Sequence, residues 1–200
     1  MAFTFFMRDQ PPLERAVDEM IPYASGRSRI KVWDAGCAQG QETYTLAIIL
    51  AERMNRFGFK NLRIDATDHD SANHFGDVVT RAVYPYDELR RMPAEYFEKY
   101  FEPAEEQGMF RVVEELRGRV QFRYHDLLSL EPIGVEYCLV VCKNVLLHFS
   151  YEQRIEVFKM FHKALAPGAF LINENTQKLP KEVAHLFTQV APDAQLFKKI

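Results

Sequence analysis

The sequence has few of the features that mark secreted, membrane or nucleic-acid-binding chains. No uninterrupted apolar run is long enough to span a bilayer, and the apolar start meets Arg8 and Asp9 too soon for a signal peptide. A formal net charge of −3 does not favour a nucleic-acid partner. The odd cysteine count, without a regular spacing, favours reduced thiols over a disulfide framework: Cys37, Cys138 and Cys142. These absences predict a cytoplasmic protein without membrane insertion.

The phosphate-binding glycine motifs are also missing, although a related turn is present. An apolar run at residues 30–33 leads into a turn of small residues with Gly36 and Gly40, followed by apolar residues at helical spacing. A strand that turns sharply into a helix forms the nucleotide end of an open α/β sheet. Here Gly-x-x-x-Gly replaces the dinucleotide fingerprint, and no Gly-Lys-Ser/Thr follows. An adenosine ligand without phosphate fits better, S-adenosylmethionine above all; the alternative is an ordinary turn whose glycines serve packing.

Acidic residues follow the second predicted strand, at residues 61–67. Asp68 stands at the strand end, where a carboxylate in an open α/β sheet accepts hydrogen bonds from ribose hydroxyls. Helix capping is the alternative for Asp68, and it is the favoured role for Asp70. The sequence predicts a helix over residues 71–81 after this turn.

The strand–helix pattern is interrupted by aromatic and charged residues between positions 83 and 124. This stretch exceeds what a crossover needs. We interpret residues 1–200 as a single domain in which residues 83–124 form a small inserted α/β subdomain. A helix is expected near residues 93–100, with short antiparallel strands near residues 109–114 and 120–124.

The two ends of the chain give weaker signals. Phe3 and Phe6 predict that the first residues either plug the core or form a lid carrying Thr4 and Arg8. Prolines are expected to exclude a helix before residue 13 and to end the helix of residues 13–21 at Pro22. Near the other end, we expect a helix over residues 181–190 and a closing edge strand at residues 195–197.

The most strand-like run, residues 137–141, is expected to be a central buried strand. Asn144 and His148 follow it and are candidates for the chemistry; packing against Phe149 is the alternative for His148. Asp126, after an earlier strand, is placed to accept a hydrogen bond from the adenine amine. Ser150 and the glutamine three residues later predict a capping box for a helix over residues 151–165, before a strand at residues 170–172.

Together these motifs resemble the chemotaxis receptor glutamate O-methyltransferases, the CheR family, in their S-adenosylmethionine domain. The matching stretches run in order: Thr-Phe-Phe at residues 4–6 with Arg8, Trp-Asp-Ala-Gly-Cys at 33–37 with Gly40 and Glu42, Asp-His-Asp at 68–70, Asp-Leu-Leu at 126–128, Cys-Lys-Asn-Val at 142–145, and Leu-Ala-Pro-Gly-Ala at 165–169. The resemblance implies a Rossmann-like α/β fold, with a mostly parallel sheet and helices on both faces. It implies S-adenosylmethionine as cofactor, S-adenosylhomocysteine as product, and no metal ion. The implied cofactor-binding residues are Thr4, Arg8, Gly36, Gly40, Glu42, Asp68, Asp126, Leu127, Asn144 and Val145.

The family reaction transfers a methyl group to a glutamate carboxylate of a protein, here a chemoreceptor or another signalling protein. Arg8 is expected to hold the acceptor or the cofactor in line, and His148 to act as a donor or base. The sequence departs from the family pattern at Gln41, Lys143 and His148, where the family has glutamate, arginine and tyrosine. Family members usually carry an amino-terminal helical domain before the Thr-Phe-Phe motif, whereas this sequence starts at that motif. These departures leave two alternatives, a non-catalytic cofactor-binding signalling module and a methyltransferase for another acceptor, such as an amine or hydroxyl.

Overall fold

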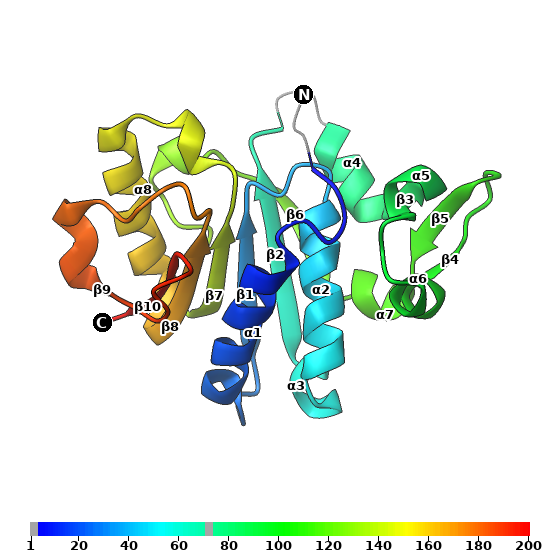
Figure 1. The fold of residues 1–200 in the computed structure, drawn as a ribbon, viewed down its shortest axis with the longest axis horizontal. Coiled ribbons are helices and arrows are strands. Elements are labelled where there is room, and N and C mark those ends of the chain that lie inside the picture. Colours follow the sequence, from blue (N-terminus) through cyan, green and yellow to red (C-terminus); the bar gives the residue numbers. More distant parts are fainter. Residues whose placement is uncertain (1–3, 71–73) are drawn as a thin grey trace.

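The computed structural model describes residues 4–70 and 74–200, and within them the main sheet has seven strands in the order β6-β2-β1-β7-β8-β10-β9 (Figure 1). Five strands are parallel, and the last two are antiparallel to their neighbours. In sheet order the strands are β6 (Val120–Tyr124), β2 (Leu62–Asp68), β1 (Ile30–Ala35), β7 (Tyr137–Cys142), β8 (Leu165–Asn173), β10 (Leu196–Lys199) and β9 (Phe187–Gln189). The chain moves outward from β1 on one side and then from β7 on the other. The strand order therefore reverses beside β1, where open α/β sheets form their ligand crevice.

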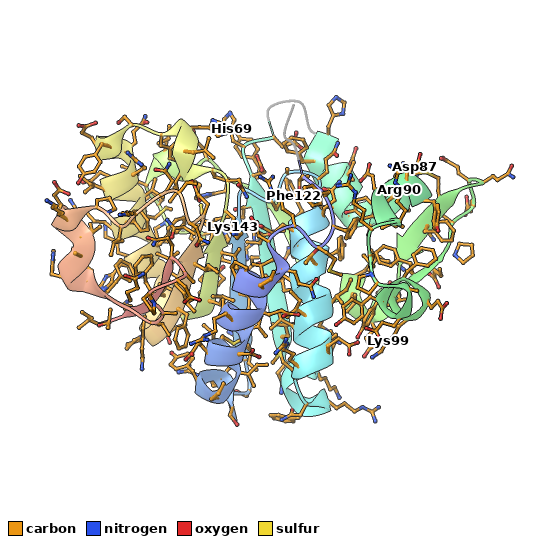
Figure 2. The ribbon with its side chains drawn as sticks, in the orientation of Figure 1. His69, Asp87, Arg90, Lys99, Phe122 and Lys143 are labelled. Atoms are coloured by element: carbon orange, nitrogen blue, oxygen red, sulfur yellow. The ribbon has the colours of Figure 1, made fainter. Side chains whose placement is uncertain are left out.

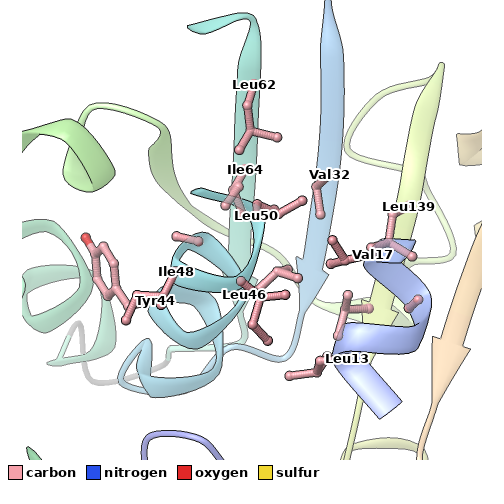
Figure 3. Close-up of a cluster of buried hydrophobic side chains, with 14 of the residues drawn as sticks. Leu13, Val17, Val32, Tyr44, Leu46, Ile48, Leu50, Leu62, Ile64 and Leu139 are labelled. Carbon is pink, nitrogen blue, oxygen red and sulfur yellow. The ribbon is translucent and has the colours of Figure 1, made fainter. Parts of the chain in front are cut away.

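Helices cover both faces of this sheet, as predicted. Successive residues of a strand point to opposite faces, so Val32 and Trp33 of β1 belong to two different cores. The helices α1 (Gln10–Ala24) and α2 (Gln41–Arg53) pack on the first core, part of which is shown in Figure 3. The helix α8 (Tyr151–Ala164) packs on the second, and its predicted capping box with Ser150 is confirmed. The α/β fold class is therefore confirmed.

A second, three-stranded antiparallel sheet stands beside the main one (Figure 1). Its strands pair in the order β3-β5-β4 and are interleaved with short helices. The elements here are β3 (Val83–Pro85), α5 (Tyr86–Leu89), α6 (Ala94–Tyr100), β4 (Phe101–Pro103), β5 (Met109–Val112) and α7 (Glu114–Arg117). The helix near residues 93–100 was predicted, whereas β3 and β4 were not.

The strand predicted at residues 120–124 is present, but its predicted antiparallel pairing within the small subdomain is wrong. This strand is β6, which pairs in parallel with β2 and forms an edge of the main sheet. Phe122 of β6 lies against Gly76 of α4 (His74–Arg81), where an added Cβ would stand 2.8 Å from its ring. The parallel register satisfies the backbone groups of β2, and alternation along a five-residue strand does not encode which sheet it joins.

Polar contacts fix the small sheet to the rest of the fold. Gln41 donates to Glu88 at 2.8 Å, and the carboxylate of Glu52 accepts from both Lys99 and Tyr100 at 2.8 and 2.6 Å. Lys99, Asp87 and Arg90 mark this side of the molecule in Figure 2. The cores of the two sheets are continuous, so α2 is the common support of both.

The prolines near the start were misinterpreted. The helix α1 begins at Gln10 and carries both Pro11 and Pro12 in its first turn, and Pro22 lies inside its last turn. A proline in the first turn removes only an N–H that has no partner within the helix, and its fixed φ suits a helix start. The helix is therefore longer at both ends than the predicted residues 13–21.

The carboxyl-terminal region also differs from the prediction. The expected helix over residues 181–190 is a 3₁₀ helix, η3 (Lys181–Leu186), followed by β9. The expected edge strand is β10, which lies between β8 and β9, so β9 forms the edge. The short helix α3 (Arg56–Lys60) lies between α2 and β2 in the chain. Phe3 and the first three residues of the helix predicted over 71–81 lie outside the described residues. Among the described helices, none has the length and apolar character needed to cross a bilayer.

Candidate functional site

A cavity of about 660 Å³ opens at the carboxyl ends of β1, β2 and β7. Its volume lies within the range of small-molecule sites. Among the residues proposed for the site from sequence, all but Gly40 line it. The lining residues are Thr4, Arg8, Gly36, Cys37, Ala38, Glu42, Asp68, His69, Phe75, His125, Asp126, Leu127, Leu128, Lys143, Asn144, Val145, Leu147, His148 and Phe149.

The two glycines of the turn after β1 have different roles. Gly36 has φ +95°, and an added Cβ would stand 2.2 Å from Val145 Cγ2, so only glycine fits where the loops after β1 and β7 meet. Gly40 is the N-cap residue before α2, with φ +89°, and its added Cβ would instead meet Val79 of α4 and the Tyr84 hydroxyl at 2.9 and 3.0 Å. Gly40 therefore serves close packing behind the turn, which was the alternative considered for these glycines.

Asp68 and Asp70 also divide two roles between them. Asp68 faces the cavity, and its Oδ2 accepts a hydrogen bond from the backbone N–H of Ala38 at 2.8 Å, which ties β2 to the glycine turn. Burial raises the pKa of Asp68. The carboxylate of Asp70 accepts from three backbone N–H groups of residues 74–76 at 2.9, 2.7 and 3.0 Å. Its predicted capping role is confirmed; although desolvation raises its pKa, these three donors outweigh it and the net pKa is lowered.

A pair of carboxyl groups lies beneath the turn, and the sequence did not reveal it. Asp34 at the end of β1 is fully buried and accepts a hydrogen bond from the Thr43 hydroxyl. Burial raises its pKa to about 6, although the hydrogen bonds from Thr43 and Glu42 oppose this. Burial and then the charge of Asp34 raise the pKa of Glu42, which lines the cavity, while Lys143 lowers it. Each carboxyl group influences the pKa of the other, so the protonation of the two groups is linked.

The segment before α1 forms one wall of the cavity. Phe6 is buried and meets Tyr84 and Phe101 edge-on with ring centres 4.9 and 5.6 Å apart, which is the predicted plug. Arg8 lines the cavity and donates from Nη2 to Asn144 Oδ1 at 3.0 Å. The segment from Thr4 onward therefore combines both roles considered for it, anchorage in the core and polar groups at the site.

The loop after β7 supplies the facing wall. Lys143 is buried, and its ammonium group lies 3.2 Å from Asp9 Oδ2, so it ties the loop to the segment before α1. Asn144 has a left-handed backbone, with φ +60°, and its N–H donates to Glu174 Oε2 at 3.2 Å. His148 is exposed at the cavity mouth and lines it, rather than being packed away.

The third wall follows β6. Asp126 faces the cavity and also caps the 3₁₀ helix η1 (Leu127–Ser129), because its Oδ1 accepts from Leu128 N at 2.8 Å. His69 stands beside it, with Nδ1 2.9 Å from the Tyr124 hydroxyl and 3.8 Å from Asp126 Oδ2. Figure 2 shows His69 and Lys143 at the same edge of the sheet. The sequence reasoning missed His69, Phe75 and His125, although each lies within a few residues of a motif position.

The donor and acceptor set suits S-adenosylmethionine. Carboxylates of Asp68 and Asp126 are available for ribose hydroxyls and an adenine amine, and the carboxyl group of Glu42 is available for a ligand ammonium group. Arg8 and Lys143 provide positive charge for a ligand carboxylate. In the part of the chain that the structure describes, no three His, Cys, Asp or Glu side chains are grouped to hold a metal ion.

A glycine turn without a phosphate motif, an acidic residue after the second strand and a cavity at the strand ends define an S-adenosylmethionine-binding α/β domain. The chain belongs to the CheR methyltransferase family, because residues 2–195 match the model described as "CheR methyltransferase, SAM binding domain". The resemblance and the predicted cofactor are thereby confirmed.

Two relatives named as chemotaxis methyltransferases agree with this assignment, and a third similar protein is uncharacterized. Chemotaxis protein methyltransferase 1 of Pseudomonas aeruginosa is 33% identical over 179 residues, covering 84% of this chain and 63% of that protein. Chemotaxis protein methyltransferase Cher2 of Pseudomonas putida is 30% identical, covering 84% of this chain and 62% of that protein. An uncharacterized 104.1 kDa protein of Rhodobacter capsulatus is 30% identical, covering 88% of this chain but 18% of that protein. The chain thus spans less than two-thirds of the length of these relatives.

Proposed function

We propose that this chain transfers the methyl group of S-adenosylmethionine to a glutamate carboxylate of a protein. The observation that carries this proposal is the placement of Arg8, which is fixed to Asn144 at 3.0 Å in the same cavity as the cofactor-binding candidates. A fixed guanidinium group recognises a carboxylate with suitable geometry. The family of the chain and the names of its relatives support a carboxylate acceptor on a chemotaxis protein.

The cavity divides into two parts under this proposal. The cofactor half comprises Gly36, Glu42, Asp68, Asp126 and Leu127. The acceptor half lies on the facing wall and comprises Asn144, Leu147 and His148, with Thr4, Arg8 and Val145 at the boundary between the halves. The carboxyl groups of the cofactor half receive the donor groups of the cofactor, and the guanidinium group of Arg8 receives a carboxylate.

The residues of this chain have mainly to align the reactants. When bound, S-adenosylmethionine supplies an electrophilic methyl group on its sulfonium centre. A glutamate side chain with a pKa of about 4.3 is ionised at neutral pH, so its methylation needs no general base. Arg8 holds the acceptor carboxylate in line, and His148 donates a second hydrogen bond at the mouth. Alignment of this kind contributes roughly 7–11 kcal/mol.

The proposed acceptor is a chemoreceptor or another signalling protein, and the proposed location is the cytoplasm. Three free, buried cysteines support that location, because none of them needs an oxidising compartment: Cys37, Cys138 and Cys142.

Transfer of labelled methyl groups tests the proposal. The purified chain is incubated with methyl-labelled S-adenosylmethionine and candidate receptor domains, and the label is then treated with mild base. A methyl ester is released by base, and we expect this label to disappear in an Arg8→Ala variant but to persist when exposed Arg15, on the outer face of α1, is changed to Ala. Base-stable label would indicate an amine or hydroxyl acceptor. Binding of S-adenosylhomocysteine without any transfer would indicate a cofactor-binding signalling module.

A further inference from the structure

A buried carboxyl group lies behind the acceptor half, outside the residues that line the cavity. Glu174 directly follows β8 and is only 4% exposed. Its Oε2 accepts the N–H of Asn144 at 3.2 Å, and its Oε1 is buried without a hydrogen-bond partner among the described residues. A buried carboxyl group is unfavourable unless it makes compensating contacts, and its contacts here are directed at the loop after β7.

That loop needs such support, because Asn144 has a left-handed backbone with φ +60°. Asparagine tolerates this conformation better than most residues, yet it remains less favourable than a right-handed backbone. In this conformation the side-chain Oδ1 of Asn144 accepts the hydrogen bond from Arg8. A continuous path therefore runs from Glu174 through Asn144 to the guanidinium group.

The loop is held at a second point as well, because the ammonium group of Lys143 lies 3.2 Å from Asp9 Oδ2. Burial raises the pKa of Glu174, while backbone N–H donors and the positive charge of Lys143 oppose this shift. The hydrogen bond from Asn144 N–H therefore ties the buried carboxyl group to a loop residue that lines the cavity. Motion of Glu174 would displace the residue that accepts from Arg8.

We propose that Glu174 is a positioning residue, which orients Asn144 and thereby fixes Arg8 at the boundary between cofactor and acceptor. This inference rests on the proposed function, because it assigns Glu174 a role in that same site. Glu174 itself is not among the residues that line the cavity.

A double-mutant cycle on binding of S-adenosylhomocysteine, measured by calorimetry, tests the path. We expect Glu174→Ala to weaken binding by about tenfold, and Glu174→Gln, which keeps an acceptor oxygen, by about threefold. In an Asn144→Ala background the same Glu174→Ala change should weaken binding by less than about twofold, because the path is already broken. Additive losses would overturn the proposal, since a merely structural role predicts them.

Asn173→Ala is the matched control. Asn173 is the buried neighbour on the same strand end, and its side chain donates to the Gln177 carbonyl at 2.7 Å rather than to the loop after β7. We expect this variant to lower the unfolding midpoint without weakening S-adenosylhomocysteine binding. Equal loss of affinity in the Asn173 and Glu174 variants would contradict a specific role of Glu174.

Amide hydrogen exchange separates failure of this inference from failure of the proposed function. If the wild-type chain does not bind S-adenosylhomocysteine, the proposed function falls, yet the exchange rate of the Asn144 amide still reports the loop. We expect this amide to exchange faster in Glu174→Ala than in the wild type and in Asn173→Ala. An unchanged rate would overturn the positioning role whether or not the cofactor binds.

Discussion

The glycine turn of the cofactor half is held by two adjacent strand ends, whereas the contact of Arg8 with the acceptor half joins segments far apart in sequence. In the first, Gly36 N donates to the Thr67 carbonyl at 2.8 Å, so the ends of β1 and β2 hold the turn through backbone groups. In the second, Arg8 meets Asn144 across 136 positions. The glycine turn therefore depends on local motifs, and the Arg8–Asn144 contact depends on how the whole chain closes around them.

The largest effect is expected where the two halves meet, at Gly36. Gly36→Ala places a Cβ 2.2 Å from Val145 Cγ2 in a left-handed backbone, so overpacking and strain together should lower the free energy of unfolding by about 2–5 kcal/mol. Binding of S-adenosylhomocysteine should be lost. Gly26→Ala is the control, because Gly26 has φ +78° but nothing within 4 Å of an added Cβ. Equal losses in urea denaturation of the two variants would show that strain alone matters and that the halves are not in contact.

Asp68→Ala separates a cofactor contact from a structural one. Loss of a charge-assisted hydrogen bond to ribose should weaken S-adenosylhomocysteine binding by about 1.5–3 kcal/mol in calorimetry, roughly ten- to a hundredfold. Asp70→Ala, two residues away, removes the cap of α4 and should instead reduce stability by about 1 kcal/mol with little change in affinity. Similar affinity losses in both variants would remove the distinction between these two aspartates.

The buried carboxyl pair beneath the glycine turn predicts that stability depends on pH. The folded pKa of Asp34, about 6, exceeds the unfolded value of 3.8, so the folded state binds the extra proton between these values and stability falls as pH rises through this window. Relative to Asp34→Asn, the wild type should lose on the order of 2–3 kcal/mol of unfolding free energy between pH 4 and pH 7. Parallel urea-derived stability curves for the two proteins would contradict this.

The smallest effect on cofactor affinity is expected at His148, in the acceptor half. Because His148 is exposed, His148→Ala should change S-adenosylhomocysteine affinity by less than about 0.5 kcal/mol. Loss of the proposed hydrogen bond from His148 to the acceptor should nevertheless make methyl-ester formation slower by roughly tenfold, measured as kcat. A larger loss in affinity than in rate would place His148 in the cofactor half.

The sequence was most informative where a structure is local. The run from β1 through the glycine turn into α2 needs small residues at fixed positions, and Gly36 was predicted from that spacing. Asp68 was predicted from its place after the second strand, and both residues line the cavity. The strand β6 was assigned to the wrong sheet because an alternating pattern shows a strand but not its neighbour. The start of α1 was predicted too late because Pro11 was taken to exclude a helix. Proline disrupts the middle of a helix but suits its first turn.

The missed site residues have a common physical cause. Asp34 looks like any residue of a strand end, and its pairing with Glu42 arises only after the turn has brought α2 back over β1. His69 is adjacent to a motif, yet its role depends on Tyr124 from a distant strand. Glu174 lies behind the acceptor half and contacts Asn144 there. Such contacts form only when distant segments come together in the fold, so no periodic pattern in the sequence indicates them.

The strand β6 follows the long stretch of chain that forms the small sheet, and this position has a consequence for the order of folding. Between α4 and β6 the chain builds the whole small sheet, and each doubling of such a loop costs only about 0.6 kcal/mol in closure entropy, although distant pairings form slowly. We expect pulse-labelled hydrogen exchange during refolding to protect β1 and β2 before β6; simultaneous protection would argue against this order. Tyr124 and Asp126 come into place only with β6. The part of the cavity proposed to bind the nucleoside would then be completed late in folding. A folding defect confined to the small sheet would therefore leave this part incomplete, even if every residue lining it were unchanged.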